Sequence, residues 1–138
     1  MNAQALRDIA ATLVAGDKGP LAMDESTRTC NRRFASLDLP QTEAARRAYR
    51  ELLVTTPGLG DSISGAILYD ETIRQGTEDG KPFVEVLRDA GIVPGIKGNV
   101  GAKDLAGHPG EETTEVRDHG SGGPPSGWRR IGGTLKLR

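Results

Sequence analysis

Two short apolar runs end abruptly on charged residues, and they constrain the fold more than any other feature of the sequence. Leu21-Ala22-Met23 is followed at once by Asp24, and the run from Ile92 to Ile96 is followed by Lys97. Short continuous apolar runs are typical of buried parallel strands, whose carboxyl ends carry side chains to the rim of a sheet or barrel. We therefore expect one strand to end before Asp24 and another to end at Lys97.

Helical patterns separate these strands. Apolar residues recur at helical spacing from Leu6 to Val14, and residues 31–36 can form a brief helix. Thr42 is a candidate N-cap for a helix that ends near Thr55, before Pro57. Residues 62–68 have the composition of a further strand, and a helix is expected from Pro82 to Ala90.

Strands that alternate with helices predict βα units and a parallel sheet. Because the carboxyl ends of parallel strands lie at one edge, Asp24, Asp70 and Lys97 are expected to converge there. Two simpler interpretations remain open: Asp24 as a turn residue that caps the next helix, and Lys97 as a solvated strand end.

The sequence changes character late in the chain. Residues 116–138 are rich in glycine and proline and have little apolar periodicity, so they predict an irregular tail. Residues 134–138 could form a degraded fourth strand. We therefore divide the chain into an ordered part, 1–115, and a tail, 116–138.

Composition excludes several classes of protein. The formal net charge is −1, which argues against a nucleic-acid partner. One cysteine permits no internal disulfide, and the sequence has no apolar stretch of membrane-spanning length, so we expect a cytoplasmic protein without a membrane partner. His108 and His119 match no ligand spacing, so no metal or cofactor is expected.

Further motifs occur in a recognisable order. They are Leu21–Thr27, Thr55–Leu59, Ser64–Leu68, Asp79–Phe83, Gly91–Lys97, Leu105–Gly107 and Gly110–Thr114. In this order the chain resembles class I fructose-bisphosphate aldolase from about Leu6 to Glu115. The resemblance implies an α/β fold, an incomplete (β/α)₈ TIM barrel with only the first three or four βα units.

The resemblance also assigns roles to five residues. Asp24 would be the carboxylate beside the Schiff base, and it would assist proton transfer. Ser26 and Thr29 would line the pocket for the C6 phosphate, with Arg33 close by. Lys97 resembles the family's phosphate-binding lysine, and an ammonium group suits that task.

Two further roles depend on a looser match at the end of the chain. The segment Leu135-Lys136-Leu137-Arg138 resembles the family's Phe-Ala-Lys-Trp-Arg strand. Lys136 would then be a catalytic proton-relay lysine, and Arg138 would bind substrate. The chain also departs from the family pattern at Arg28, which stands where the family has glycine.

The function implied by the resemblance is that of a glycolytic lyase. Such an enzyme cleaves fructose 1,6-bisphosphate to dihydroxyacetone phosphate and glyceraldehyde 3-phosphate through a lysine Schiff base. The match ends before that lysine, so the fragment alone is expected to be inactive. Three alternatives remain open: a non-catalytic phosphate-binding protein, a partner of aldolase subunits, and a degenerate, frameshifted gene product. The fructose bisphosphate and triose phosphates are the expected small-molecule partners, and a homo-oligomer is left open.

Overall fold

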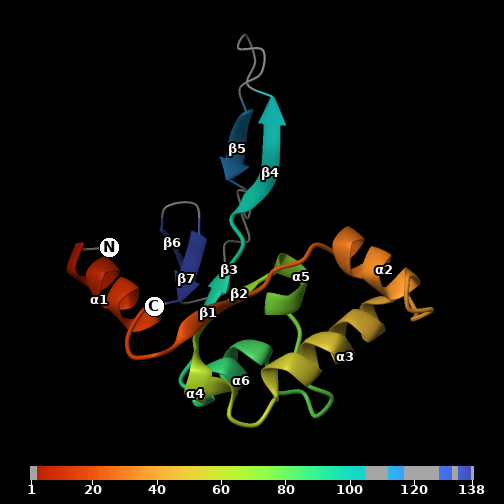
Figure 1. Ribbon diagram of the computed structural model, residues 1–138, viewed down its shortest axis with the longest axis horizontal. Helices are drawn as coiled ribbons and strands as arrows, with labels where there is room; N and C mark the ends of the chain where they lie inside the picture. The colour runs from red at the N-terminus through yellow and green to blue at the C-terminus, as the bar shows by residue number, and fades with distance from the viewer. Residues whose placement is uncertain (1–2, 105–111, 117–127, 132–133, 138) are drawn as a thin grey trace.

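The computed structural model describes residues 3–104, 112–116, 128–131 and 134–137 (Figure 1). In chain order its elements are α1 (Ala3–Leu13), β1 (Gly19–Met23), α2 (Thr27–Ala35), α3 (Glu43–Val54), α4 (Leu59–Ser62), β2 (Ile63–Leu68), α5 (Asp70–Ile73), α6 (Phe83–Asp89), β3 (Val93–Ile96), β4 (Asn99–Asp104), β5 (Glu112–Val116), β6 (Trp128–Ile131) and β7 (Thr134–Leu137). The predicted alternation of strands and helices is therefore present up to β3.

Three parallel strands form the part of the sheet that the sequence predicted. β1 pairs with β2 and β2 pairs with β3, both in parallel, and Met23, Leu68 and Ile96 lie in one row across the sheet. The helices α3, α4 and α6 lie on one side of these strands, and the β4–β5 pair extends away on the opposite side (Figure 1). The predicted α/β class and parallel sheet are confirmed for this part of the chain.

A strand lies where the sequence predicted a degraded fourth one, with β7 covering Thr134–Leu137. It does not extend the parallel sheet, because it runs antiparallel to β3, and β6 pairs antiparallel with β7. A parallel neighbour would need a crossover connection, usually a helix, and the described residues between β3 and β7 contain strands only. Two short runs separated by Gly132-Gly133 are instead a typical hairpin signal.

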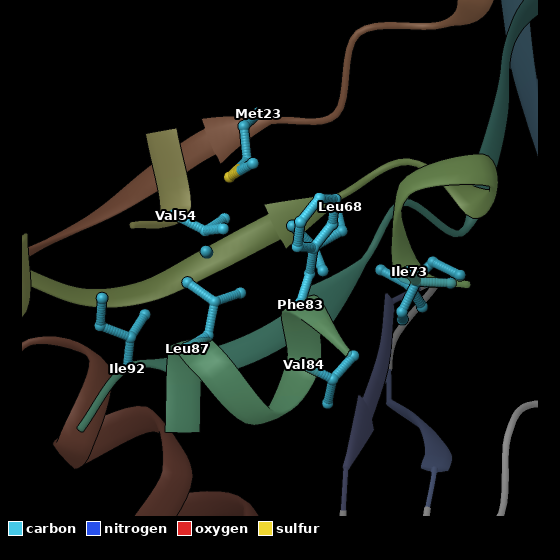
Figure 2. Close-up of a cluster of buried hydrophobic side chains, with 10 residues drawn as sticks. Met23, Val54, Leu68, Ile73, Phe83, Val84, Leu87 and Ile92 are labelled. Carbon is cyan, nitrogen blue, oxygen red and sulfur yellow. The ribbon is translucent and has the colours of Figure 1, made fainter. Parts of the chain in front are cut away.

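The hydrophobic core lies between the sheet and the helices on one of its faces. Figure 2 shows Phe83 and Leu87 pointing from α6 toward the strands, where Met23 and Leu68 meet them. The side chains of Phe83, Leu68 and Leu87 are completely buried. Because side chains alternate along a strand, Met23 and Asp24 face opposite sides of the sheet, and the helix layer accommodates the large Met23.

The other face of the sheet is less well covered. Ala22 and Ile67 lie beside each other in register, and Ala22 is exposed while Ile67 is only partly buried. β1 is also an edge strand of its sheet. The sheet therefore has an open edge at β1 and one incompletely covered face.

The observed helix boundaries follow from capping. The Thr42 side chain accepts a hydrogen bond from the Ala45 N–H, so α3 begins where the sequence predicted. α2 begins at Thr27 instead of Asn31, because Ser26 caps it in the same way. Pro82 is the N-cap of α6, so this helix begins at Phe83, one residue later than predicted.

The buried face of α3 carries charged residues. Leu52, an apolar residue of this helix, is 70% exposed. The buried residues are Arg46, Arg50 and Val54, spaced four residues apart. The two arginines can be buried because carboxylates from other elements meet them.

A close backbone contact gives the first testable prediction. A Cβ atom at Gly60 would lie 2.0 Å from the Ala90 carbonyl oxygen, whereas a Cβ at Gly19 would meet nothing within 4 Å. Gly60→Ala is therefore expected to lower the free energy of unfolding by about 1–3 kcal/mol, because the backbone must shift. Gly19→Ala is the matched control and should change it by less than about 0.5 kcal/mol. Urea denaturation of both variants tests this, and equal effects would contradict it.

Candidate functional site

Asp24 and Lys97 form an ion pair at the carboxyl edge of the parallel sheet. Asp24 follows the last residue of β1, and Lys97 follows the last residue of β3. β2 lies between these strands, so the pair spans its carboxyl end, with the Lys97 Nζ 3.0 Å from the Asp24 Oδ2. The sequence predicted this convergence. Both side chains are partly exposed, so a ligand can reach the lysine.

The third residue expected at this edge has a local partner. Asp70 is the first residue of α5, directly after the carboxyl end of β2. Its carboxylate pairs with Arg74, one turn later in the chain, at 3.1 Å. Asp70 is therefore at the predicted edge and forms an i, i+4 ion pair there.

Ser26 and Thr29 are joined at the start of α2. The Ser26 Oγ accepts a hydrogen bond from the Thr29 N–H at 3.3 Å and lies 3.1 Å from the Thr29 Oγ1. Both residues are partly buried. The N-cap role explains why a hydroxyl stands at position 26, and it leaves two hydroxyl groups together close behind Asp24 in the chain.

Arg33 forms an ion pair with Glu25 through one of its nitrogens. The Arg33 Nη1 donates to the Glu25 Oε1 at 2.6 Å, and the Arg50 Nη1 donates to the Glu25 Oε2 at 2.7 Å. Burial alone would raise the pKa of Glu25, but the hydrogen bonds from Arg50 and Arg33 lower the pKa below its ordinary value. Glu25 therefore links α2 to α3 through ion pairs with Arg33 and Arg50. Its neighbour Asp24 lies at the rim.

A second ion pair between an arginine of α3 and a glutamate holds α5, the short helix after β2. Arg46 donates to both carboxylate oxygens of Glu71, each at 2.7 Å, and to the Asn31 side chain at 2.9 Å. The bidentate geometry suits the planar guanidinium. The hydrogen bonding of Arg46 to the Glu71 carboxylate raises the pKa of Arg46 more than burial lowers it, so the net shift is upward.

An open cleft of about 670 Å³ lies next to Ser26. The residues that line it have polar side chains, and none of them is a carboxylate: Ser26, Thr27, Arg28, Asn31, Arg32, Gln41 and Tyr69. Arg28 and Arg32 lie one helical turn apart on α2, so the cleft has a positive lining. A cleft with this lining suits an anionic ligand.

The remaining predicted site residues are at the end of the chain. Lys136 lies in β7, in register with Gly95 of β3. Arg138 lies outside the described residues. In the described part of the chain, no group of three or more His, Cys, Asp or Glu side chains could hold a metal ion. Among the same residues, no helix has the length and apolar character needed to cross a membrane.

Sequence reasoning missed the two buried arginines. Arg46 is 7% exposed and Arg50 is 2% exposed, although an arginine on a helix is ordinarily solvated. Their partners Glu25 and Glu71 lie 25 residues away in the chain. A faint signal existed in the spacing of Arg46, Arg50 and Val54, which share one face of α3.

The described fold is of the α/β class, with charged residues at the carboxyl edge of its parallel strands. Comparisons with known proteins identify the family. The family model "Glycolytic: Fructose-bisphosphate aldolase class-I" matches residues 5–121. A probable fructose-bisphosphate aldolase class 1 of Xanthomonas campestris is 55% identical over 118 residues, which are 86% of this chain and 35% of that protein. Chloroplastic fructose-bisphosphate aldolase 3 of Arabidopsis thaliana is 57% identical over 71% of this chain and 25% of its own length.

A solved structure agrees with these relatives. Fructose-bisphosphate aldolase of Plasmodium falciparum, crystallised with TRAP and a small-molecule inhibitor, is 41% identical with a TM-score of 0.75, over 84% of this chain and 34% of that one. The chain belongs to the class I fructose-bisphosphate aldolase family. It spans between a quarter and about a third of the length of these relatives.

Proposed function

We propose that this chain forms the first three βα units of the (β/α)₈ barrel of a class I fructose-bisphosphate aldolase and carries the part of its rim that binds the C6 phosphate. The main support is the Asp24–Lys97 pair, which sets a carboxylate and an ammonium group at the carboxyl edge of the parallel strands. The open β1 edge and the exposed Ala22 further support an incomplete barrel.

Each rim residue has a chemical task in this proposal. Lys97 neutralises phosphate charge, and the hydroxyl groups of Ser26 and Thr29 donate hydrogen bonds to phosphate oxygens. Lys97 exchanges its Asp24 partner for the phosphate when the ligand binds. Asp24 is then free to assist proton transfer beside the Schiff base.

The three arginines near this rim differ in their availability. Arg33 binds Glu25 through one nitrogen and retains further N–H groups that can reach a phosphate. Arg28 and Arg32 line the cleft beside Ser26 and add positive charge there. We propose that Lys136 serves as a proton relay and that Arg138 binds substrate, as the family pattern implies.

The complete reaction needs a lysine amine that condenses with the ketone of the sugar, so that the C3–C4 bond can break. The resemblance to the family ends before the position of that lysine. A polypeptide of these 138 residues should therefore bind fructose 1,6-bisphosphate without cleaving it. The binding function and the loss of turnover can be measured on the same sample.

Removal of Lys97 tests the proposed function. Lys97→Ala is expected to weaken binding of fructose 1,6-bisphosphate about 10- to 100-fold, because a charged hydrogen bond to phosphate is lost. Lys81→Ala is the matched control, since Lys81 is an exposed lysine that pairs with Asp89 and not with a rim residue, and it should leave affinity unchanged. Isothermal titration calorimetry measures both. Equal affinities of wild type and Lys97→Ala would refute the proposal, and turnover in a coupled assay would refute the inactivity.

A further inference from the structure

Arg50 contacts both sides of the turn that leads from β1 to α2. Its Nη1 donates to the Glu25 Oε2 at 2.7 Å, and its Nη2 donates to the Glu25 carbonyl oxygen at 3.2 Å. The same Nη2 lies 3.4 Å from the Cys30 Sγ, in the first turn of α2. A single guanidinium therefore holds the side chain and backbone of Glu25 and the start of the following helix.

Glu25 lies between two residues of the candidate site, so its contacts with Arg50 affect both of them. Glu25 stands between Asp24 and Ser26 in the sequence, so fixing its backbone restricts the direction of both neighbours. The Cys30 N–H donates to the Ser26 carbonyl oxygen at 2.9 Å, which closes the other end of the same turn. Arg50 thus acts on two rim residues without touching either side chain.

The surroundings of Arg50 hold its guanidinium in one geometry. The side chain is 2% exposed, and its guanidinium carbon lies 5.1 Å from the centre of the Tyr49 ring. Tyr49 in turn packs edge-to-face against Phe34 of α2, with ring centres 5.7 Å apart. A planar fork buried in this way provides direction as well as charge, whereas a lysine carries its three donors on one nitrogen at the end of a flexible stem and lacks the fixed planar geometry.

Burial of the Arg50–Glu25 pair is poorly explained by stability alone. Replacing a buried ion pair with apolar residues of similar volume is often neutral or stabilising, so such a pair is weak evidence of a stabilising role. A geometric role accounts better for an arginine whose three hydrogen bonds all end on the turn or on the helix it starts.

We propose that Arg50 is a positioning residue that holds the turn 24–30, so that Asp24 and Ser26 are presented to the phosphate and the reacting sugar. This inference rests on the proposed function. It assigns Arg50 no contact with the ligand. Its effect on binding passes through Glu25.

The test compares Arg50→Lys with Arg46→Lys in the full 138-residue chain. Arg46 is the matched control, because it is also buried on α3 and also pairs with a glutamate, but on α5 instead of in the turn. Amide hydrogen exchange reports the order of the turn through Thr29 and Cys30, whose N–H groups bond to Ser26. The amides of Phe83 and Ile92, which bond to Gln75 and Leu87, report the rest of the fold.

In Arg50→Lys, exchange at Thr29 and Cys30 should accelerate about tenfold while Phe83 and Ile92 are unchanged, because only the turn opens. Affinity for fructose 1,6-bisphosphate should fall about fivefold or more, since the hydroxyl donors lose their alignment. In Arg46→Lys, the affinity should stay within about twofold of wild type. If Arg50→Lys does not fold, Glu25→Gln provides the same readouts, and exchange at Thr29 and Cys30 should accelerate more than exchange at Phe83 and Ile92.

Three results would overturn the inference: unchanged exchange at Thr29 and Cys30, uniform acceleration throughout the fold, or equal losses of affinity in Arg50→Lys and Arg46→Lys. Failure of the proposed function has a different signature. In that case the wild-type chain binds no fructose 1,6-bisphosphate, while the local exchange effect of Arg50→Lys is retained and supports its hold on the turn.

Discussion

Phe83→Ala is expected to lower the free energy of unfolding by about 3–5 kcal/mol, because it leaves a cavity under the sheet. Phe83 is completely buried and packs with Leu68 and Met23 between α6 and the strands (Figure 2). A loss of this size is a large fraction of the roughly 5–15 kcal/mol that stabilises a typical domain. The variant should therefore show a much lower urea midpoint by circular dichroism.

An exposed apolar residue provides the control for this prediction. Leu52 is 70% exposed on α3, so Leu52→Ala should change the free energy of unfolding by less than about 0.5 kcal/mol. A small effect of Phe83→Ala, or comparable effects at both positions, would mean that α6 does not pack on the sheet as described.

Glu25→Ala is the second change with a large expected effect. It removes the carboxylate that partners Arg50, whose side chain is only 2% exposed, and an unpaired buried charge costs about 3–5 kcal/mol. Glu85→Ala is the matched control, since it removes an exposed carboxylate of α6 and should cost less than about 0.5 kcal/mol. Urea denaturation at neutral pH measures the free energy of unfolding of both variants. Equal losses would contradict the stabilising role of the Glu25–Arg50 ion pair.

The same pair predicts how stability depends on pH. The pKa of Glu25 is lowered in the folded chain from its ordinary value of 4.5, because the hydrogen bonds from the two arginines outweigh the burial that raises it. A lowered pKa contributes stability that is complete above the ordinary value and is lost as the pH falls through the folded value. The stability difference between wild type and Glu25→Gln should therefore be constant near neutral pH and shrink below about pH 4.5. A difference that persists at pH 3 would contradict this assignment.

Local sequence signals predicted the elements that depend on local chemistry. Patterns of only a few residues were enough to predict these elements. Examples are the Thr42 cap, the proline before α6 and the apolar runs before Asp24 and Lys97. The convergence of Asp24 and Lys97 followed from the parallel sheet, because that arrangement brings all carboxyl ends to one edge.

Features that depend on distant partners could not be predicted in this way. The burial of Arg46 and Arg50 requires Glu71 and Glu25, each 25 residues away, and an arginine on a helix is otherwise expected to be solvated. The antiparallel direction of β7 depends on which strand it joins, and short apolar runs do not reveal their partners. The pairing of Arg33 with Glu25 likewise became evident only from the three-dimensional arrangement.

The measurement that tests the central claim most directly is an amide chemical-shift titration of the 138-residue chain with inorganic phosphate. The account predicts that Ser26, Thr29 and Lys97, which come from two separate segments, shift together with one dissociation constant. The Lys97→Ala variant should lose this response at Ser26 and Thr29 as well. Shifts scattered over the exposed lysines and arginines, or a response at α2 that persists without Lys97, would contradict a shared phosphate site at this rim.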